Sequence, residues 1–317
     1  MPAMKKNCRN TLASPRRRQT GRAGAFTVTE LLVVLGMTAL LASVLLSASF
    51  TTQDRVLRAE CASNLKKIGS AVLIYAGENN DFFPIESWKN PPPTGTGNPW
   101  QTYEACRFAA AGSKQIVEGP YGLGLLFFGK EVADTKTFYC PSVLIPDYAY
   151  ATYSEASWPW PSIPPDYALG NPYVRCSYSY YPQPKATEVI YDPNFGPFTV
   201  PLLASQSMVL VSPNPGDPAQ GAHNYPVPLK TSDVNPSKAV SCDVLQTWNT
   251  LSHETAGQPA GVNALFGDGH VNWVPVRGNN KKGSFQPFDP KIWNSSPAIV
   301  IGNDPTLFRI IVNGLAP

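Results

Sequence analysis

The hydrophobic pattern of the chain begins with a long apolar run close to the N-terminus. Residues 31–53 contain no charged residue and no proline, and their first part reads LLVVLGMTALLASVLLSASF. As an α-helix, about twenty apolar residues span about 30 Å, which is the thickness of the hydrocarbon layer of a bilayer. The run therefore predicts one membrane-spanning helix.

A helical pattern continues beyond this run. Apolar side chains recur every three or four residues and form one stripe: Leu57, Cys61, Leu65, Ile68, Val72 and Tyr75. No proline occurs between residues 27 and 83, and Gly77 followed by Asn79 and Asn80 provides a stop. We expect one continuous helix from about Thr27 to Gly77, roughly 75 Å long, whose second half packs on a soluble domain.

Beyond residue 83 the pattern changes. This part holds all but two of the 33 prolines, which disfavour long helices, and its short apolar runs alternate with Pro, Gly and Asn. The strand-like runs are residues 122–128, 137–140, 189–191, 208–211, 239–245 and 299–301. Proline-rich loops are expected at residues 90–99, 155–172 and 212–228. The whole pattern predicts an α+β protein, in which a long N-terminal helix, half of it transmembrane, packs on an antiparallel β-sheet domain.

The clearest β-hairpin is predicted near the C-terminus. Residues 262–266 and 270–274 flank a Gly-Asp-Gly turn, in which positive φ angles are readily adopted. Asp268 and Gly269 are then structural turn residues. Side chains alternate between the two faces of a strand, so we expect the face that carries Trp273 to be buried and the other to be wet.

The net charge of +3 hides an uneven distribution. Seven of the 25 Lys and Arg residues, and none of the 22 Asp and Glu residues, lie in residues 1–25. The remainder has a net charge of −4, so no nucleic-acid partner is expected. Basic residues before an apolar run keep that end of the run in the cytoplasm, which predicts export of the residues after 53.

Two interpretations of the apolar run are open. The first is an ordinary secretory signal that is cut near residues 47–49, where small residues stand at suitable offsets. The second is a permanent anchor, which the length of the run favours, because signal cores usually have about 7–15 residues. Glu30 stands at the start of the run. A carboxylate at mid-bilayer costs about 2.5–3.5 kcal/mol, so Glu30 requires a cationic partner or a position at the headgroups.

The start of the run resembles the prepilin signature of type IV pilins and type II secretion pseudopilins. Residues 24–34 read GAFTVTELLVV, which is a small residue, Phe-Thr-x-x-Glu and a run of Leu and Val. The resemblance implies that a prepilin peptidase cleaves the Ala25–Phe26 bond and that the Phe26 amine is then methylated. It also implies that Glu30 neutralises this amine on an adjacent subunit. The family usually has Gly where this chain has Ala25.

This resemblance divides the chain into four parts. Residues 1–25 are the basic leader, residues 26–53 the transmembrane half of the helix, residues 54–78 its exported half, and residues 79–317 a β-rich globular domain. The implied location is the inner membrane, with a single pass, a cytoplasmic N-terminus and a periplasmic or cell-surface C-terminal domain. The implied partners are the prepilin peptidase and other pilin-like subunits.

Two further motifs resemble a pilin-like family that carries, near its C-terminus, a His, nine residues and Asp-Gly. Residues 61–69 (CASNLKKIG) are similar to the end of that family's long helix, and residues 266–273 (FGDGHVNW) are similar to its C-terminal motif. His253 is the candidate for the upstream histidine. Fourteen residues, and not nine, separate it from Asp268.

Few residues offer candidate chemistry. His253, Asp268 and His270 could supply imidazole and carboxylate ligands to a divalent metal, but their spacing along one strand does not close a coordination sphere. We therefore expect a turn aspartate, a strand histidine and no metal. Calcium would take Asp268 and Asp243, but no acidic loop pattern accompanies them. The sequence holds no nucleophile motif and no phosphate-binding glycine loop, so we expect no catalytic residue and no cofactor.

Five cysteines remain when Cys8 leaves with the leader. An exported domain permits disulfides, and an odd number leaves at least one free thiol or an intermolecular bond. Cys61 lies on the apolar stripe of the helix and is expected to be a buried thiol. The other four could then form two bridges, whose connectivity the sequence does not fix: Cys106, Cys140, Cys176 and Cys242.

Two functions fit these observations. The favoured one is a non-enzymatic, prepilin-like structural subunit of a type IV pilus or of a type II secretion pseudopilus. The alternative is a membrane-anchored periplasmic enzyme or binding protein, with or without a metal. A deep pocket lined by clustered His, Asp or Cys residues would favour the alternative, whereas a helix docked on a sheet without such a pocket would favour the subunit.

Overall fold

The structure is a computed structural model and describes residues 27–86, 102–143, 145–165, 167, 172–192, 196–202, 208–211, 223–226, 229–248, 251–255, 258–276, 288, 293 and 305–315. Only the backbone is described for residues 42–52, 208–211, 223–226, 258 and 305. The chain forms two compact units, Met1–Ser49 and Phe50–Pro317. The expected leader (1–25), Phe26, the expected loop 90–99 and the expected strand 299–301 lie outside the described residues.

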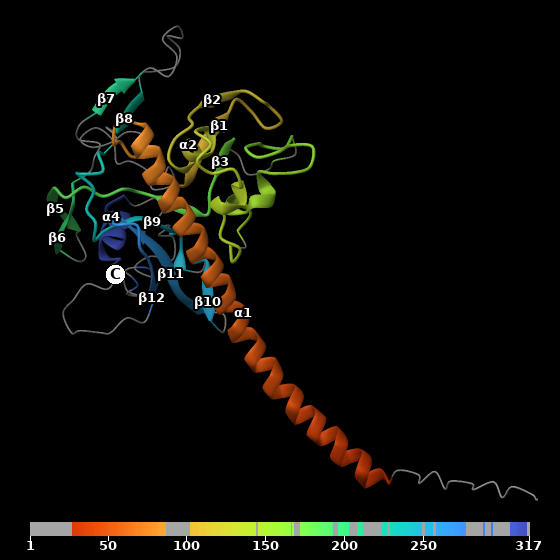
Figure 1. Ribbon diagram of the computed structural model, residues 1–317. Helices are drawn as coiled ribbons and strands as arrows, with labels where there is room; N and C mark the ends of the chain where they lie inside the picture. The colour runs from red at the N-terminus through yellow and green to blue at the C-terminus, as the bar shows by residue number, and fades with distance from the viewer. Residues whose placement is uncertain are drawn as a thin grey trace, which may run out of the picture. The chain divides into compact units, whose positions relative to one another are not determined.

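One long helix begins the described chain (Figure 1). This helix, α1 (Val28–Glu78), has 51 residues and lies within one residue of the predicted bounds at each end. It stops where the sequence predicts, because Asn80 adopts a positive φ of 55° that no α-helix continues. Within the described residues, no helix combines the length and the apolar content needed to cross a membrane.

The second unit is built on a five-stranded sheet. The strands run in the order β10 (His253–Thr255), β11 (Gln258–Phe266), β9 (Ala239–Asp243) and β4 (Tyr178–Tyr180), and β12 (Val271–Pro275) also pairs with β11. Every pairing among the described strands is antiparallel. The predicted α+β class with antiparallel sheets is therefore confirmed, and so is the predicted hairpin, which β11 and β12 form.

Apolar clusters cover both faces of this sheet. Along β11, Val262, Ala264 and Phe266 belong to a cluster that includes α4 (Pro305–Gly314), whereas Leu265 belongs to a cluster that includes the second half of α1. Figure 1 shows the two helices with the sheet between them. The hairpin pattern predicts one buried face, whereas α4 covers a second face that no local pattern indicates. The expectation of one wet face on the hairpin is consequently wrong, because Val274 on the α4 side is buried while Trp273 is only half-buried.

Shorter elements surround this core. They are β1 (Glu104–Phe108), β2 (Ile116–Glu118) and β3 (Tyr173–Arg175) in one sheet, the hairpins β5 (Thr187–Asp192) with β6 (Gly196–Pro201) and β7 (Met208–Val211) with β8 (His223–Pro226), helix α2 (Leu123–Phe128), and the 3₁₀ turns η2 (Thr135–Phe138), η3 (Pro146–Tyr148) and η4 (Tyr150–Thr152).

Some of the expected strands are correct and others are wrong. The predicted strands 189–191, 208–211 and 239–245 overlap β5, β7 and β9. Two predicted strands are helical instead, because α2 and η2 occupy those positions, and β8 lies within a predicted loop. Short apolar runs such as LGLLFF fit a buried helix as well as a buried strand, so periodicity alone does not decide between them.

The second half of α1 packs on the sheet through the predicted stripe. Cys61, Leu65, Ile68 and Val72 are 0–2% exposed. Gly69 allows the helix to come close, because a Cβ at this position would lie 2.7 Å from Leu265 Cδ1. The apolar stripe is thus the core-facing side of the helix, as the spacing predicts.

The cysteines pair differently from the expectation. Cys61 is not a free thiol but forms a disulfide with Cys140, across 79 residues of sequence, with a Cα–Cα distance of 5.2 Å. Cys106, Cys176 and Cys242 are buried free thiols. Burial raises the pKa of Cys106 to about 12, which keeps it protonated and unreactive. Sequence spacing did not reveal the disulfide because its two halves meet only after η2 has folded back onto α1.

Candidate functional site

The N-terminus of α1 carries the first candidate site residue, Glu30. The Thr27 backbone N–H donates to Glu30 Oε2 (2.9 Å), and the Glu30 backbone N–H donates to Thr27 Oγ1 (3.2 Å). This reciprocal pair is a capping box, which satisfies two backbone donors that a helix start leaves without partners. The Thr-x-x-Glu spacing is the sequence signal of this box, and the charge of Glu30 alone does not indicate it. Ala25 and Phe26, the predicted processing residues, lie outside the described residues.

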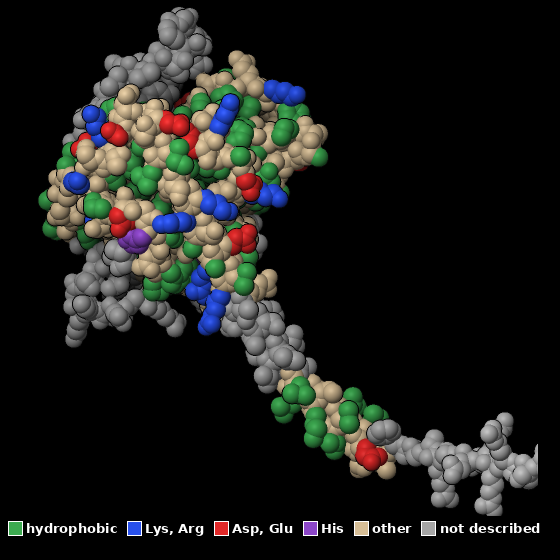
Figure 2. Space-filling model, viewed as in Figure 1, with side chains coloured by type: hydrophobic (Ala, Val, Ile, Leu, Met, Phe, Trp, Pro, Cys, Tyr) green, Lys and Arg blue, Asp and Glu red, His purple; other side chains and the backbone are tan. Residues whose placement is uncertain are grey.

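The following part of α1 presents apolar side chains to its surroundings. Nine large ones are between 51% and 74% exposed: Val28, Leu31, Leu32, Val33, Val34, Leu35, Met37, Leu40 and Leu41. Figure 2 shows hydrophobic side chains on the visible face of this segment. Contiguous apolar surface of this kind is rare on soluble monomers and marks a region that a membrane or another protein covers. We call residues 28–41 the apolar segment.

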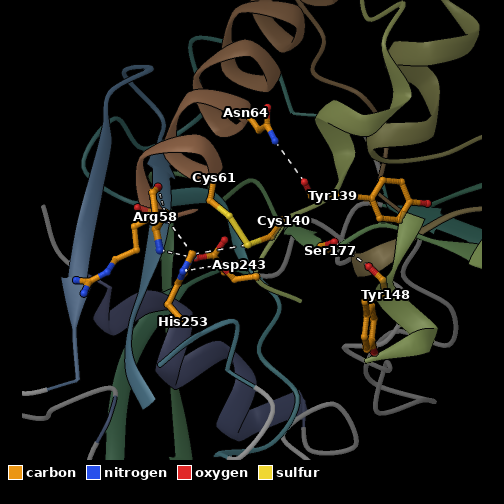
Figure 3. The surroundings of a disulfide bond; sticks show 11 residues. Arg58, Cys61, Asn64, Tyr139, Cys140, Tyr148, Ser177, Asp243 and His253 are labelled. Atoms are coloured by element: carbon orange, nitrogen blue, oxygen red, sulfur yellow. Dashed lines mark hydrogen bonds and ion pairs between the residues drawn. A yellow bond between two sulfur atoms is a disulfide. The ribbon is translucent and has the colours of Figure 1, made fainter. Parts of the chain in front are cut away.

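The second candidate site is a group of polar side chains beneath the docked half of α1 (Figure 3). Cys61 comes from α1, Cys140 follows η2, Asp243 ends β9 and His253 begins β10. All four are at most 3% exposed, and one candidate ligand atom from each lies within 4.8 Å of the others. We call these four residues the buried cluster.

Hydrogen bonds fix the two ionisable side chains of the buried cluster. His253 Nε2 lies 3.3 Å from Asp243 Oδ2, and His253 Nδ1 lies 3.1 Å from Ser142 Oγ. The Asn263 backbone N–H also donates to Asp243 Oδ2 (2.6 Å). These contacts place one ring nitrogen of His253 beside the Asp243 carboxylate and the other beside the Ser142 hydroxyl.

One oxygen of the buried cluster has no hydrogen-bond partner among the described residues. This atom is Asp243 Oδ1, and the Asp243 side chain is fully buried. A buried polar atom without a partner costs about 1–3 kcal/mol, and more when it carries charge. A cation or a further hydrogen-bond donor beside Asp243 Oδ1 would therefore stabilise the buried cluster.

The motif Cys61-x-x-Asn64 explains how the helix holds the segment after η2. Residues three apart lie on the same face of a helix. Cys61 bonds to Cys140, and Asn64 Nδ2 donates to the carbonyl of the preceding residue, Tyr139 (3.2 Å). The two side chains thus fasten neighbouring residues of one segment to adjacent turns of α1, which Figure 3 shows.

The three candidate metal ligands that the sequence analysis weighed and set aside, His253, Asp268 and His270, are not brought together. His253 pairs with Gly261, whereas the turn that holds Asp268 follows Phe266. Five residues of strand separate these positions, a distance of about 17 Å at 3.3 Å per residue. The two candidate calcium ligands lie in different surroundings, because Asp243 is fully buried in the cluster and Asp268 is exposed in the turn.

Asp268 and Gly269 form the structural turn that the sequence predicts. Gly269 has a φ of 85°, in the left-handed region. Asp268 Oδ1 accepts from the His270 backbone N–H (3.0 Å), and its carboxylate also pairs with the His270 ring. The backbone hydrogen bond from His270 holds the pKa of Asp268 below its usual value. The His270 ring stacks on Phe266 at 4.5 Å.

The long spacing between His253 and Asp268 also has a structural reason. Glu254 pairs with Pro259, and Thr255 with Gln258, so part of this spacing belongs to the pairing of β10 with β11. His253 Nε2 lies 3.3 Å from Asn263 Nδ2 of β11.

Comparisons with protein-family models, with curated proteins and with solved structures gave no match.

Proposed function

We propose that this protein is a pilin-like structural subunit, which is held in the inner membrane by the first half of α1 and assembles with other copies through the same segment. The observation that carries the proposal is the apolar segment, residues 28–41, with its exposed apolar side chains and its single acidic residue. The β-rich domain would then lie outside the cytoplasmic membrane, in the periplasm or at the cell surface.

Burial of the apolar segment would drive both membrane insertion and assembly. Full burial of one Val, Leu or Met side chain contributes about 1.5–3 kcal/mol. Lipid covers such a helix in the membrane, and the same helices of neighbouring copies would cover it in an assembly. The sequence continues the apolar character to residue 53, which gives the run the length of a membrane span.

Glu30 would fix how neighbouring copies align along their helices. The capping box satisfies Glu30 through uncharged donors of Thr27 and leaves its negative charge without a counter-charge from this residue. Cleavage before Phe26 by a prepilin peptidase would create a cationic amine four residues away. A Glu30 carboxylate beside the Phe26 amine of a neighbouring copy would form a charge pair, which is far less costly in an apolar setting than two separate charges.

The second half of α1 is tied firmly to the β-rich domain, as a subunit needs when force passes between its helix and its domain. The disulfide and the Asn64 hydrogen bond fasten the helix on one side. Lys66 Nζ donates to the Gly269 carbonyl (2.8 Å) at the hairpin turn. Covalent and polar ties of this kind keep the exported domain at one position along the helix.

The test separates the charge of Glu30 from its capping role. Glu30→Gln keeps a side chain that completes a capping box but removes the charge, whereas Glu30→Val removes both. Both variants are made in a Val33→Cys background, and oxidative cross-linking between copies in the membrane measures assembly. We expect both substitutions to lower the cross-linked fraction to the same extent. Cross-linking that stays at the parent level in the Glu30→Gln variant would contradict the charge pair.

An anchored enzyme is the second candidate function, because Ser142, His253 and Asp243 form a hydrogen-bonded series. Series of Ser, His and Asp activate the nucleophile of many hydrolases. His253 and Asp243 are fully buried, however, and the pocket of about 460 Å³ nearby is lined by Cys140 and its neighbours and not by Ser142 or His253. Labelling by a fluorophosphonate probe that disappears in a Ser142→Ala variant would favour the enzyme.

A further inference from the structure

The buried cluster has the composition of a metal site as well as that of a disulfide. Two cysteines, one histidine and one aspartate converge from four different elements, with their ligand atoms within 4.8 Å of one another. We propose that, when the disulfide is reduced, Cys61, Cys140, His253 and Asp243 bind one thiophilic divalent cation such as Zn²⁺. Of the candidate metal ligands considered from the sequence, this site contains His253 and Asp243.

The distances already present fit a tetrahedral ion. Zn²⁺ binds thiolate sulfur at about 2.3 Å and imidazole nitrogen or carboxylate oxygen at about 2.0–2.2 Å, so two ligands of one tetrahedral ion lie about 3.3–3.8 Å apart. His253 Nε2 lies 3.3 Å from Asp243 Oδ2 and 3.6 Å from Cys140 Sγ. The sulfur atoms need only to separate after the bond between them is broken, through rotation of the two cysteine side chains.

The carboxylate of Asp243 supplies an independent reason for a cation. Asp243 is fully buried and its Oδ1 has no hydrogen-bond partner among the described residues. A buried carboxylate is stabilised by a cation far more than by neutral donors. In the disulfide form the cluster offers Asp243 only the His253 ring, because disulfide sulfur carries no charge.

The surroundings hold the ligands in the orientation that a metal requires. A metal-bound histidine usually donates its other ring N–H to a neighbouring acceptor. Here Nδ1 of His253 lies 3.1 Å from Ser142 Oγ, which leaves Nε2 directed toward Cys140 and Asp243. The Asn263 backbone N–H holds Asp243 Oδ2 in the same way (2.6 Å).

The disulfide and the metal exclude each other. A dithiol reductant gives two electrons and two protons to the S–S bond, which yields the Cys61 and Cys140 thiols and the oxidised reductant. The metal ion then displaces both thiol protons to solvent and forms two metal–sulfur bonds. A small-molecule disulfide takes two electrons from the two thiolates and leaves as two thiols after protonation by solvent, which restores the Cys61–Cys140 bond and releases the ion. The cluster is thus a redox-controlled site, with the metal form confined to chains whose disulfide is open.

The test uses the full chain in detergent micelles with Co²⁺ as the probe. Tetrahedral Co²⁺ has intense visible bands, and thiolate ligation adds a charge-transfer band in the near ultraviolet. We expect the chain reduced with a phosphine to bind one Co²⁺ with both signatures, and to lose them when Zn²⁺ or an oxidant is added. Equal binding by the oxidised chain, or no stoichiometric binding by the reduced chain, would overturn the proposal.

Variants identify the ligands. Asp243→Asn and His253→Gln preserve the size of the side chains but remove a ligand. Ser142→Ala removes only the hydrogen-bond partner of His253 and should weaken Co²⁺ binding by about 10–100-fold. We expect each of the first two variants to weaken Co²⁺ binding more than Ser142→Ala does. Cys106→Ser with Cys176→Ser is the matched control, since these buried thiols lie outside the cluster, and it should bind like the parent. Binding that survives the Asp243 and His253 substitutions would contradict the assignment.

A measurement on the parent chain needs no variant to fold. Zn²⁺ should slow alkylation of Cys61 and Cys140 in the reduced chain, as mapped by peptide mass spectrometry. Cys106, Cys176 and Cys242 lie outside the cluster, are the internal control and should react at unchanged rates. Equal protection of these three thiols and of Cys61 and Cys140 would indicate general stabilisation in place of ligation and would also overturn the proposal.

Discussion

The disulfide between α1 and the segment after η2 should supply a large part of the stability of the second unit. Cys61→Ala with Cys140→Ala removes it. The bond closes 79 residues of sequence, and a loop of about 80 residues loses roughly 4.5 kcal/mol of chain entropy in the unfolded state when it is cross-linked. Domains are typically stable by about 5–15 kcal/mol. The loss should therefore bring the protein close to unfolding at growth temperature.

Urea unfolding of the full chain in detergent, followed by tryptophan fluorescence, measures this effect. Three samples are compared in the presence of a chelator: the oxidised parent, the reduced parent and the doubly substituted chain. The reduced parent keeps every side-chain atom, so a fall of about 4.5 kcal/mol in its unfolding free energy isolates the cross-link. Cys106→Ala, which removes a buried sulfur without a bond, controls for lost packing. A reduced parent with the same urea midpoint as the oxidised one would refute the reasoning.

Two further predictions concern the packing of the second unit. Glu86 is buried, and burial raises its pKa to about 8 although Arg309 opposes the shift. Because the pKa in the folded state exceeds that in the unfolded state, the unfolding free energy should fall as the pH rises from about 4.5 to about 8. Urea melts at several pH values should show that Glu86→Gln removes this dependence. Gly69→Ala places a Cβ 2.7 Å from Leu265 and should destabilise by about 1–3 kcal/mol. Gly77→Ala meets no atom within 4 Å and should stabilise by about 0.5–1 kcal/mol, so equal thermal shifts in these two α1 variants would contradict the close approach.

Local patterns predicted the elements that depend on neighbouring residues. The proline-free stretch from residue 27, the apolar stripe from Leu57 to Tyr75 and the stop at Gly77 predicted α1, because all three are local signals. The Gly-Asp-Gly turn gave the hairpin of β11 and β12 for the same reason. The capping box of Thr27 and Glu30 is equally local, but it was not predicted, because Glu30 was interpreted by its charge alone.

Local sequence patterns did not predict the contacts between residues that are far apart in the chain. The Cys61–Cys140 bond spans 79 residues, and the His253–Asp243 contact requires β9 and β10 to meet at the sheet. Helix α4 was also missed, since its short run of Ile and Val resembles a strand and only its position against the sheet makes it a helix with a buried face. These contacts define the buried cluster, so that site could not be assembled from sequence spacing.

The mature N-terminus is the most direct test of the pilin-like account. Protein purified from its native membrane is digested, and mass spectrometry identifies the first residue and its modification. The account predicts a chain that begins at Phe26 with a methylated amine, with Ala25 and the basic leader removed. An N-terminus near Phe50 would establish an ordinary secretory signal and contradict the account.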